Sequence, residues 1–118
     1  MHELAVCQGL MGQLEDMAAR EQAERITRIR LRIGPLSGVE AQLLNDAFPI
    51  AAAGTLAEQA VLEIDEQPVR VRCTSCDRES DATPNRLLCA HCGDFRTQLI
   101  SGDEMLLISV ELERRESA

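Results

Sequence analysis

Four cysteines in the second half of the chain have the spacing of a metal site. Cys73 and Cys76 form one C-x2-C pair, Cys89 and Cys92 form another, and twelve residues separate the pairs. Each pair can place two thiolates on one side of an ion, and the loop between the pairs can bring them together as a tetrahedron. Because Zn2+ favours four soft, anionic sulfurs, the spacing predicts a four-cysteine zinc site. Two disulfides and an iron site of rubredoxin type are the alternatives.

The N-terminus offers a second kind of metal chemistry. The amine of Met1, the backbone nitrogen of His2 and its imidazole Nδ1 can close two fused chelate rings, and planar nitrogen ligands suit Ni(II) and Cu(II). The amide or carboxylate of Glu3, or an outside ligand, could complete the square. Since His2 is bulky, we expect Met1 to be retained. The alternative is an ordinary chain end, with Glu3 complementing the dipole of a helix.

The remaining reactive residues have plainer interpretations. His91 lies between two of the cysteines and could replace one as a ligand, but we expect it to point to solvent. Cys7 falls on the apolar stripe of a predicted helix, where an unreactive buried thiol is usual. A nucleophilic Cys7 would need a nearby base, and the chain has only 2 histidines. We therefore expect no catalytic residue and no enzyme.

Composition limits the partners. The chain has 118 residues, 20 acidic and 12 basic side chains, a net charge of −8 and 2 aromatic residues, so nucleic acid is disfavoured. Arg28, Arg30 and Arg32 could form a local basic patch, but they alternate with apolar residues as on the wet face of a strand. No segment approaches the 20 or so apolar residues that span a bilayer. We expect a cytoplasmic protein without a membrane partner and with an aliphatic core.

Apolar periodicity predicts two helices. Steps of three and four mark an amphipathic helix from Leu4 to about Arg20, and a second runs roughly from Val39 to Ala52. The glycine- and proline-rich segment 34–38 predicts a turn before the second helix. Ser37 and Glu40 have the spacing of a capping box, and Pro49 should end or kink the helix.

Alternating or extended runs predict five strands, at residues 25–33, 61–64, 69–72, 96–100 and 106–112, with the last two joined as a hairpin across 101–103. The predicted class is α+β: a small mixed sheet with two helices, plus an inserted zinc-ribbon-like domain with four cysteine ligands. The α+β domain would be discontinuous, 1–68 with 103–118, and the zinc-binding domain would span 69–102.

Together these motifs resemble the HypA/HybF family of hydrogenase maturation factors, over nearly the whole chain. The resemblance rests on Met-His-Glu-Leu at 1–4, Ile-Gly-Pro-Leu-Ser-Gly-Val-Glu at 33–40, the two cysteine pairs, and Ile-Ser-Gly-Asp-Glu at 100–104. Two departures are Ala90, where many relatives have proline after the third cysteine, and Pro49, where a charged residue is more usual. Neither position is a proposed ligand.

The resemblance implies a nickel metallochaperone. His2 would be the essential nickel ligand, with the Met1 amine and Glu3 beside it, and Cys73, Cys76, Cys89 and Cys92 would hold structural zinc. Nickel would pass to the large subunit of [NiFe]-hydrogenase, and in some relatives to urease, with help from a HypB-type GTPase. We expect a monomer or weak homodimer. The alternative is a zinc-ribbon module that binds protein or nucleic acid and carries no transferable metal.

Overall fold

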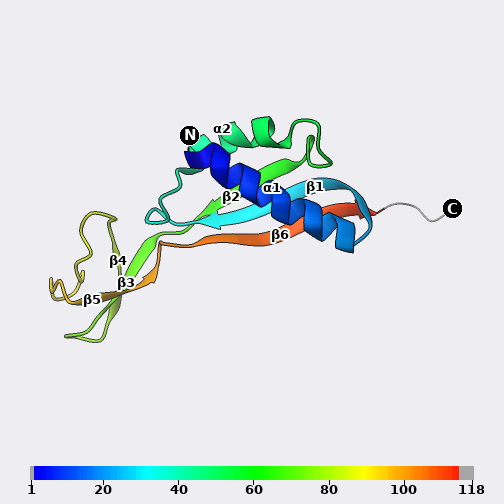
Figure 1. The fold of residues 1–118 in the computed structure, drawn as a ribbon. Coiled ribbons are helices and arrows are strands. Elements are labelled where there is room, and N and C mark those ends of the chain that lie inside the picture. Colours follow the sequence, from blue (N-terminus) through cyan, green and yellow to red (C-terminus); the bar gives the residue numbers. More distant parts are fainter. Residues whose placement is uncertain (1, 115–118) are drawn as a thin grey trace. The chain divides into compact units, whose positions relative to one another are not determined.

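The computed structural model describes residues 2–114, which form two helices and six strands (Figure 1). In chain order they are α1 (His2–Arg20), β1 (Ala23–Ile33), α2 (Ala41–Ala52), β2 (Val61–Glu66), β3 (Val69–Cys73), β4 (Glu79–Ala82), β5 (Thr97–Ser101) and β6 (Met105–Arg114). The strands form two three-stranded sheets, ordered β2-β1-β6 and β4-β3-β5. This architecture confirms the predicted α+β class with two helices.

The chain divides into two compact units. The first contains residues up to 31, 39–64 and the chain from 107, and the second contains 32–38 and 65–106. The predicted metal-binding domain, 69–102, lies within the second unit, and its boundaries stay a proposal. None of the described helices is both long enough and apolar enough to cross a membrane.

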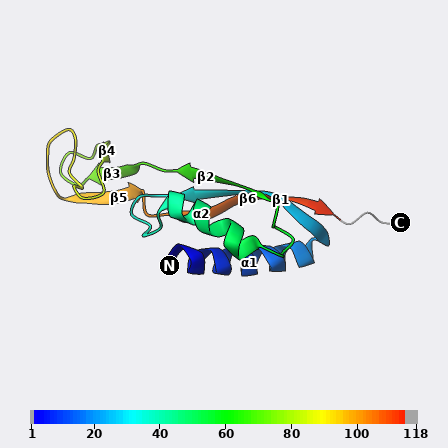
Figure 2. The same cartoon turned by 90° about the horizontal axis from the view of Figure 1, so that it is seen from above.

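In the first unit, α1 and α2 pack together over one face of the sheet (Figure 2). Strands β1 and β2 run in the same direction and β6 runs in the opposite one, so the sheet is mixed (Figures 1 and 2). The helices and β1 supply a mainly aliphatic core with Phe48 as its aromatic side chain; its members include Leu10, Leu14, Ile26, Ile29, Leu44 and Ala52. Burial of these side chains is the main driving force for this unit.

The second helix ends at Ala52, as predicted, but it differs from the prediction at its start. It begins at Ala41 after Glu40, whose side chain makes no cap hydrogen bond, so the predicted capping box with Ser37 is wrong. Of the two effects expected of Pro49, an end or a kink, the first does not occur: Pro49 lies inside the helix, which continues to Ala52. The buried side chains Leu44, Phe48 and Ala52 anchor both halves, which offsets the hydrogen bond that proline cannot donate.

In the second unit, β3 is the central strand and pairs antiparallel with both β4 and β5. The predicted hairpin between the last two strands is wrong, because β5 pairs with β3 while β6 joins the sheet of β1. β4 was not predicted; its sequence Glu-Ser-Asp-Ala has no apolar alternation. It forms because the first cysteine pair turns the chain back along β3, which supplies the hydrogen-bonding partner.

Candidate metal centre

The four predicted cysteine ligands come together in the second unit. Their sulfurs all lie within 4.8 Å of one another. Cys73 Sγ lies 3.5 Å from Cys92 Sγ, and Cys76 Sγ lies 3.6 Å from Cys89 Sγ. A disulfide needs about 2.05 Å, whereas four sulfurs bonded to one zinc at about 2.3 Å lie roughly 3.8 Å apart. All four cysteines are free, and they are clustered as for a zinc site.

Both cysteine pairs fold into the same turn. The first sulfur of each pair accepts two backbone N–H groups: Cys73 Sγ from residues 75 and 76 at 3.4 and 3.5 Å, and Cys89 Sγ from residues 91 and 92 at 3.3 and 3.4 Å. Each turn closes through a left-handed residue just after its second cysteine, Asp77 with φ 61° and Gly93 with φ 78°. The two halves of the site are therefore built alike, as the repeated spacing implies.

These amide bonds favour thiolates. The N–H of Cys92 is the main cause that lowers the pKa of Cys89 to about 6, and the N–H of Cys76 is the main cause that lowers the pKa of Cys73. Hydrogen bonds to a charged sulfur stabilise the deprotonated form, which is the form that binds metal. Backbone N–H groups thus stabilise the thiolate form of one cysteine in each half of the site, Cys73 and Cys89.

A polar network ties the two turns together. Ser75 Oγ donates to Asp94 Oδ2 at 2.5 Å, and Arg96 Nη2 donates to the same oxygen at 3.0 Å. The hydrogen bonds from Arg96 are the main cause that lowers the pKa of Asp94. Thr74 also donates its hydroxyl and its amide to the carbonyl of Arg96. Asp94 and Arg96, which follow the second cysteine pair, therefore hold the turn of the first pair in place through hydrogen bonds from Thr74 and Ser75.

His91 and Cys7, each of which had two interpretations from the sequence, have clear environments in the structure. His91 is exposed, and its Nε2 lies 3.2 Å from the carbonyl oxygen of Glu79. Cys7 is fully buried, and its sulfur donates to the carbonyl of Leu44 at 3.6 Å. Burial is the main cause that raises the pKa of the Cys7 thiol, so this sulfur is poorly suited to nucleophilic chemistry.

The N-terminal candidates are only partly described, because Met1 lies outside the described residues. His2 is exposed and is the first residue of α1. Glu3 Oε2 accepts the backbone N–H of Glu40, at 3.3 Å, and this bond is the main cause that lowers the pKa of Glu3. The beginning of α1 is thereby attached to the beginning of α2. Sequence reasoning missed this contact, which joins residues 37 positions apart.

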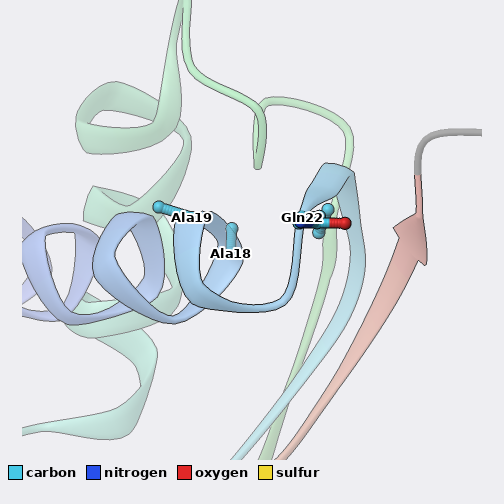
Figure 3. Close-up of a pocket in the computed structure, with 4 residues that line it drawn as sticks. Ala18, Ala19 and Gln22 are labelled. Carbon is cyan, nitrogen blue, oxygen red and sulfur yellow. The ribbon is translucent and has the colours of Figure 1, made fainter.

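A pocket in the first unit offers no comparable chemistry. It lies where α1 passes into β1 and is lined by Ala18, Ala19, Gln22 and Ala23 (Figure 3). These side chains include no thiol, imidazole or carboxylate. Within the described part of the chain, metal-ligand geometry is therefore found at the cysteine cluster.

Comparisons with known proteins agree with this architecture. A family model described as "Hydrogenase/urease nickel incorporation, metallochaperone, hypA" matches residues 1–112. The hydrogenase maturation factor HypA of Nitrosospira multiformis is 46% identical over 95% of this chain and 97% of its own length. HypA of Aquifex aeolicus is 41% identical over 96% of this chain and 98% of its own.

Solved structures give the same result. The nickel metallochaperone HypA of Helicobacter pylori superimposes with a TM-score of 0.67 and 26% identity, covering 96% of this chain and 98% of its own. A second HypA solution structure reaches a TM-score of 0.72 over 98% of both chains. By the family match and these relatives, the chain belongs to the HypA family of nickel metallochaperones for hydrogenase and urease maturation.

Proposed function

We propose that this protein binds Ni(II) at its N-terminus and helps to deliver it to the large subunit of [NiFe]-hydrogenase during maturation. The observation that carries the proposal is the extent of the family match, which runs from residue 1 through both cysteine pairs. The ligand set would be the amine of Met1, the backbone nitrogen and imidazole of His2, and a group from Glu3. The family description includes urease, so a urease client is part of the same proposal.

The proposed ligands at the N-terminus suit a nickel ion that is bound only temporarily and then released to another protein. His2 is exposed, so incoming ligands can replace the outgoing ones one at a time. Copper would outcompete nickel at nitrogen ligands by intrinsic affinity, so selectivity must come from metal supply and from partners. An accessory GTPase of HypB type is the partner we propose, and cytoplasm is the compartment.

Zinc at the cysteine cluster would be structural. Cys73, Cys76, Cys89 and Cys92 supply four sulfurs within 4.8 Å of one another. Four sulfurs would fill the tetrahedral coordination of zinc and leave no open position for a substrate. When bound, zinc would join the two cysteine turns as one rigid element. This division of roles predicts that nickel and zinc can be lost independently.

Nickel titration of untagged protein tests the proposal. We expect His2→Ala to abolish nickel binding while one zinc per chain and the helical circular dichroism are unchanged, because His2 is exposed. One extra residue before Met1 should weaken nickel binding, because it removes the terminal amine from the ligand set. Calorimetry gives the affinity, and elemental analysis gives the metal content.

The outcomes separate the candidates. Equal nickel stoichiometry in His2→Ala, or unchanged affinity in the extended protein, would remove the N-terminus from the site. If untagged wild-type protein held zinc but bound no nickel, the zinc-ribbon interaction module without transferable metal would be the better description.

A further inference from the structure

Helix α2 is apolar on two faces, and only one of them is used by the core. Leu44, Phe48 and Ala52 are buried in the first unit. On another side of the helix, Leu43 is 46% exposed and Ile50 is 66% exposed. With half-buried Ala47 they have the spacing i, i+4, i+7, which places them along one helix face. We call Leu43, Ala47 and Ile50 the α2 stripe.

The α2 stripe begins beside the first turn of α1. Glu3 in the first turn of α1 binds the N–H of Glu40, the residue that precedes α2, and both views show these two helix ends side by side (Figures 1 and 2). Leu43 and Ile50 follow Glu40 by about 5 and 15 Å along the helix axis, at roughly 1.5 Å per residue. A protein bound to the α2 stripe would therefore lie next to His2.

The surroundings of the α2 stripe are acidic. Glu40 and Asp46 lie on its two flanks by helical spacing, and Asp46 is held in place by a 2.9 Å hydrogen bond from Gln42. The two helices together carry four acidic side chains and one arginine, Arg20, which is the last residue of α1. The chain has no basic residue between Ile33 and Arg70.

Arginines of the same unit do not neutralise this face. Arg25, Arg28 and Arg30 belong to β1 and form ion pairs with acidic residues of β2 and β6, such as Arg25 with Glu113 at 3.5 Å and Arg30 with Glu63 at 3.4 Å. The positive charge is therefore held within the sheet. The helix layer keeps its negative charge.

The negative charge beside the α2 stripe indicates which kind of partner could bind there. A second copy would bring Glu40 and Asp46 against the same acids, and an anionic membrane surface would be repelled in the same way. A protein segment with apolar side chains at its centre and Arg or Lys at its edges is complementary in both respects. Such a segment would bury Leu43 and Ile50 and would pair with the flanking carboxylates.

We propose that the protein that exchanges nickel with the N-terminus docks on the α2 stripe through a basic, apolar-centred segment. This inference rests on the proposed function and adds the surface that the exchange uses. Docking there would hold the acceptor's ligands close to His2, so that each ligand replacement becomes an intramolecular step with a high effective concentration.

The test compares partner binding in matched glutamine variants of the full, zinc-loaded chain. Leu43→Gln with Ile50→Gln makes the α2 stripe polar while keeping good helix formers. Phe95→Gln is the control, since Phe95 is apolar and 76% exposed but belongs to the second unit. The probes are the purified precursor of the hydrogenase large subunit and the accessory GTPase, each measured by biolayer interferometry at low and high salt.

We expect the double variant to raise the Kd of at least one probe about tenfold or more, as for apolar anchors at the centre of an interface. Phe95→Gln should leave that Kd within about twofold, and added salt should weaken wild-type binding. Asp46→Asn keeps the acceptor for Gln42 and removes one charge, so it should weaken binding at low salt more than at high salt. If the double variant misfolds, Asp46→Asn still tests whether the partner binds at the α2 stripe.

Unchanged Kd values for both probes in the double and charge variants would overturn the inference. A wild-type homodimer that the double variant abolishes in light scattering would overturn it too, because the occupant would be a second copy. Nickel titration of the same variants separates this inference from the proposed function. If nickel still requires His2 while docking is unaffected, only the docking surface is wrong.

Discussion

At the scale of single residues, Glu3 has a role that its position in the chain does not reveal. An acid in the first turn of a helix is expected to complement the helix dipole. Here its carboxylate also accepts the N–H of Glu40, the residue before α2. The bond is solvent-exposed, so its value lies in geometry more than in stability. It fixes the residue next to His2 against a second helix.

This bond predicts a pH dependence. The pKa of Glu3 is lowered in the folded protein, chiefly by the N–H of Glu40, so the interaction is present above the unfolded pKa. It is lost as pH falls through the lower folded value. In NMR titrations, the amide of Glu40 should follow a transition with a midpoint below about 4.3, the usual value for glutamate. Glu3→Gln should remove that transition, and a midpoint at or above 4.3 would mean that the bond does not form in solution.

At the scale of elements, two glycines allow separate segments of the second unit to touch. The N–H of Gly34 donates to the carbonyl of Glu104 at 2.9 Å, and that of Leu36 donates to the carbonyl of Gly102 at 2.6 Å. A Cβ on Gly34 would lie 2.1 Å from the backbone of Gly102. Gly102 itself has φ 119° and would place a Cβ 2.9 Å from the Cα of Val69. The turn predicted at 34–38 is therefore also a packing contact.

Alanine substitutions should separate this contact from ordinary glycine effects. Gly34→Ala forces backbone against backbone and should lower the free energy of unfolding by roughly 1–3 kcal/mol. Gly12→Ala is the matched control, because a Cβ there meets no atom within 4 Å and the residue lies inside α1. It should raise the free energy of unfolding by about 0.5–1 kcal/mol. Urea melts measure both, and equal effects would contradict the proposed contact.

At the scale of the whole molecule, the two units differ in what stabilises them. The first has a core of aliphatic side chains from two helices and a sheet. The second buries few apolar residues, chiefly Ile33, Val69 and Val71, and two of its other buried side chains are Cys73 and Cys89. With so small an apolar core, this unit depends on the metal that its cysteines are proposed to hold.

Zinc removal should therefore unfold one unit and spare the other. Structural zinc contributes about 10–16 kcal/mol in finger peptides, far more than the apolar burial available here. After chelation, hydrogen exchange should lose protection in β3, β4 and β5 while α1, α2 and β1 remain protected. Simultaneous loss of protection in both units would show that they fold as one.

The sequence alone predicted the features that depend on local spacing. The C-x2-C pairs predicted the sulfur cluster, because each pair needs only its own turn and the loop between them to close. Apolar periodicity predicted α1 and β1, because the spacing of apolar residues along the chain shows which face of a helix or strand is buried. The family resemblance also followed from short motifs, and the full-length comparisons confirmed it.

Tertiary structure decided what depends on residues distant in the chain. β4 is a strand because β3 lies beside it, β5 pairs with β3 instead of β6, and α2 continues past Pro49 because its buried face is anchored on both sides. The bond from Glu40 to Glu3 and the second, exposed face of α2 likewise appear only when the helices meet. Local patterns encode which residues can be buried or can bind metal, but the choice of partner is made by three-dimensional packing.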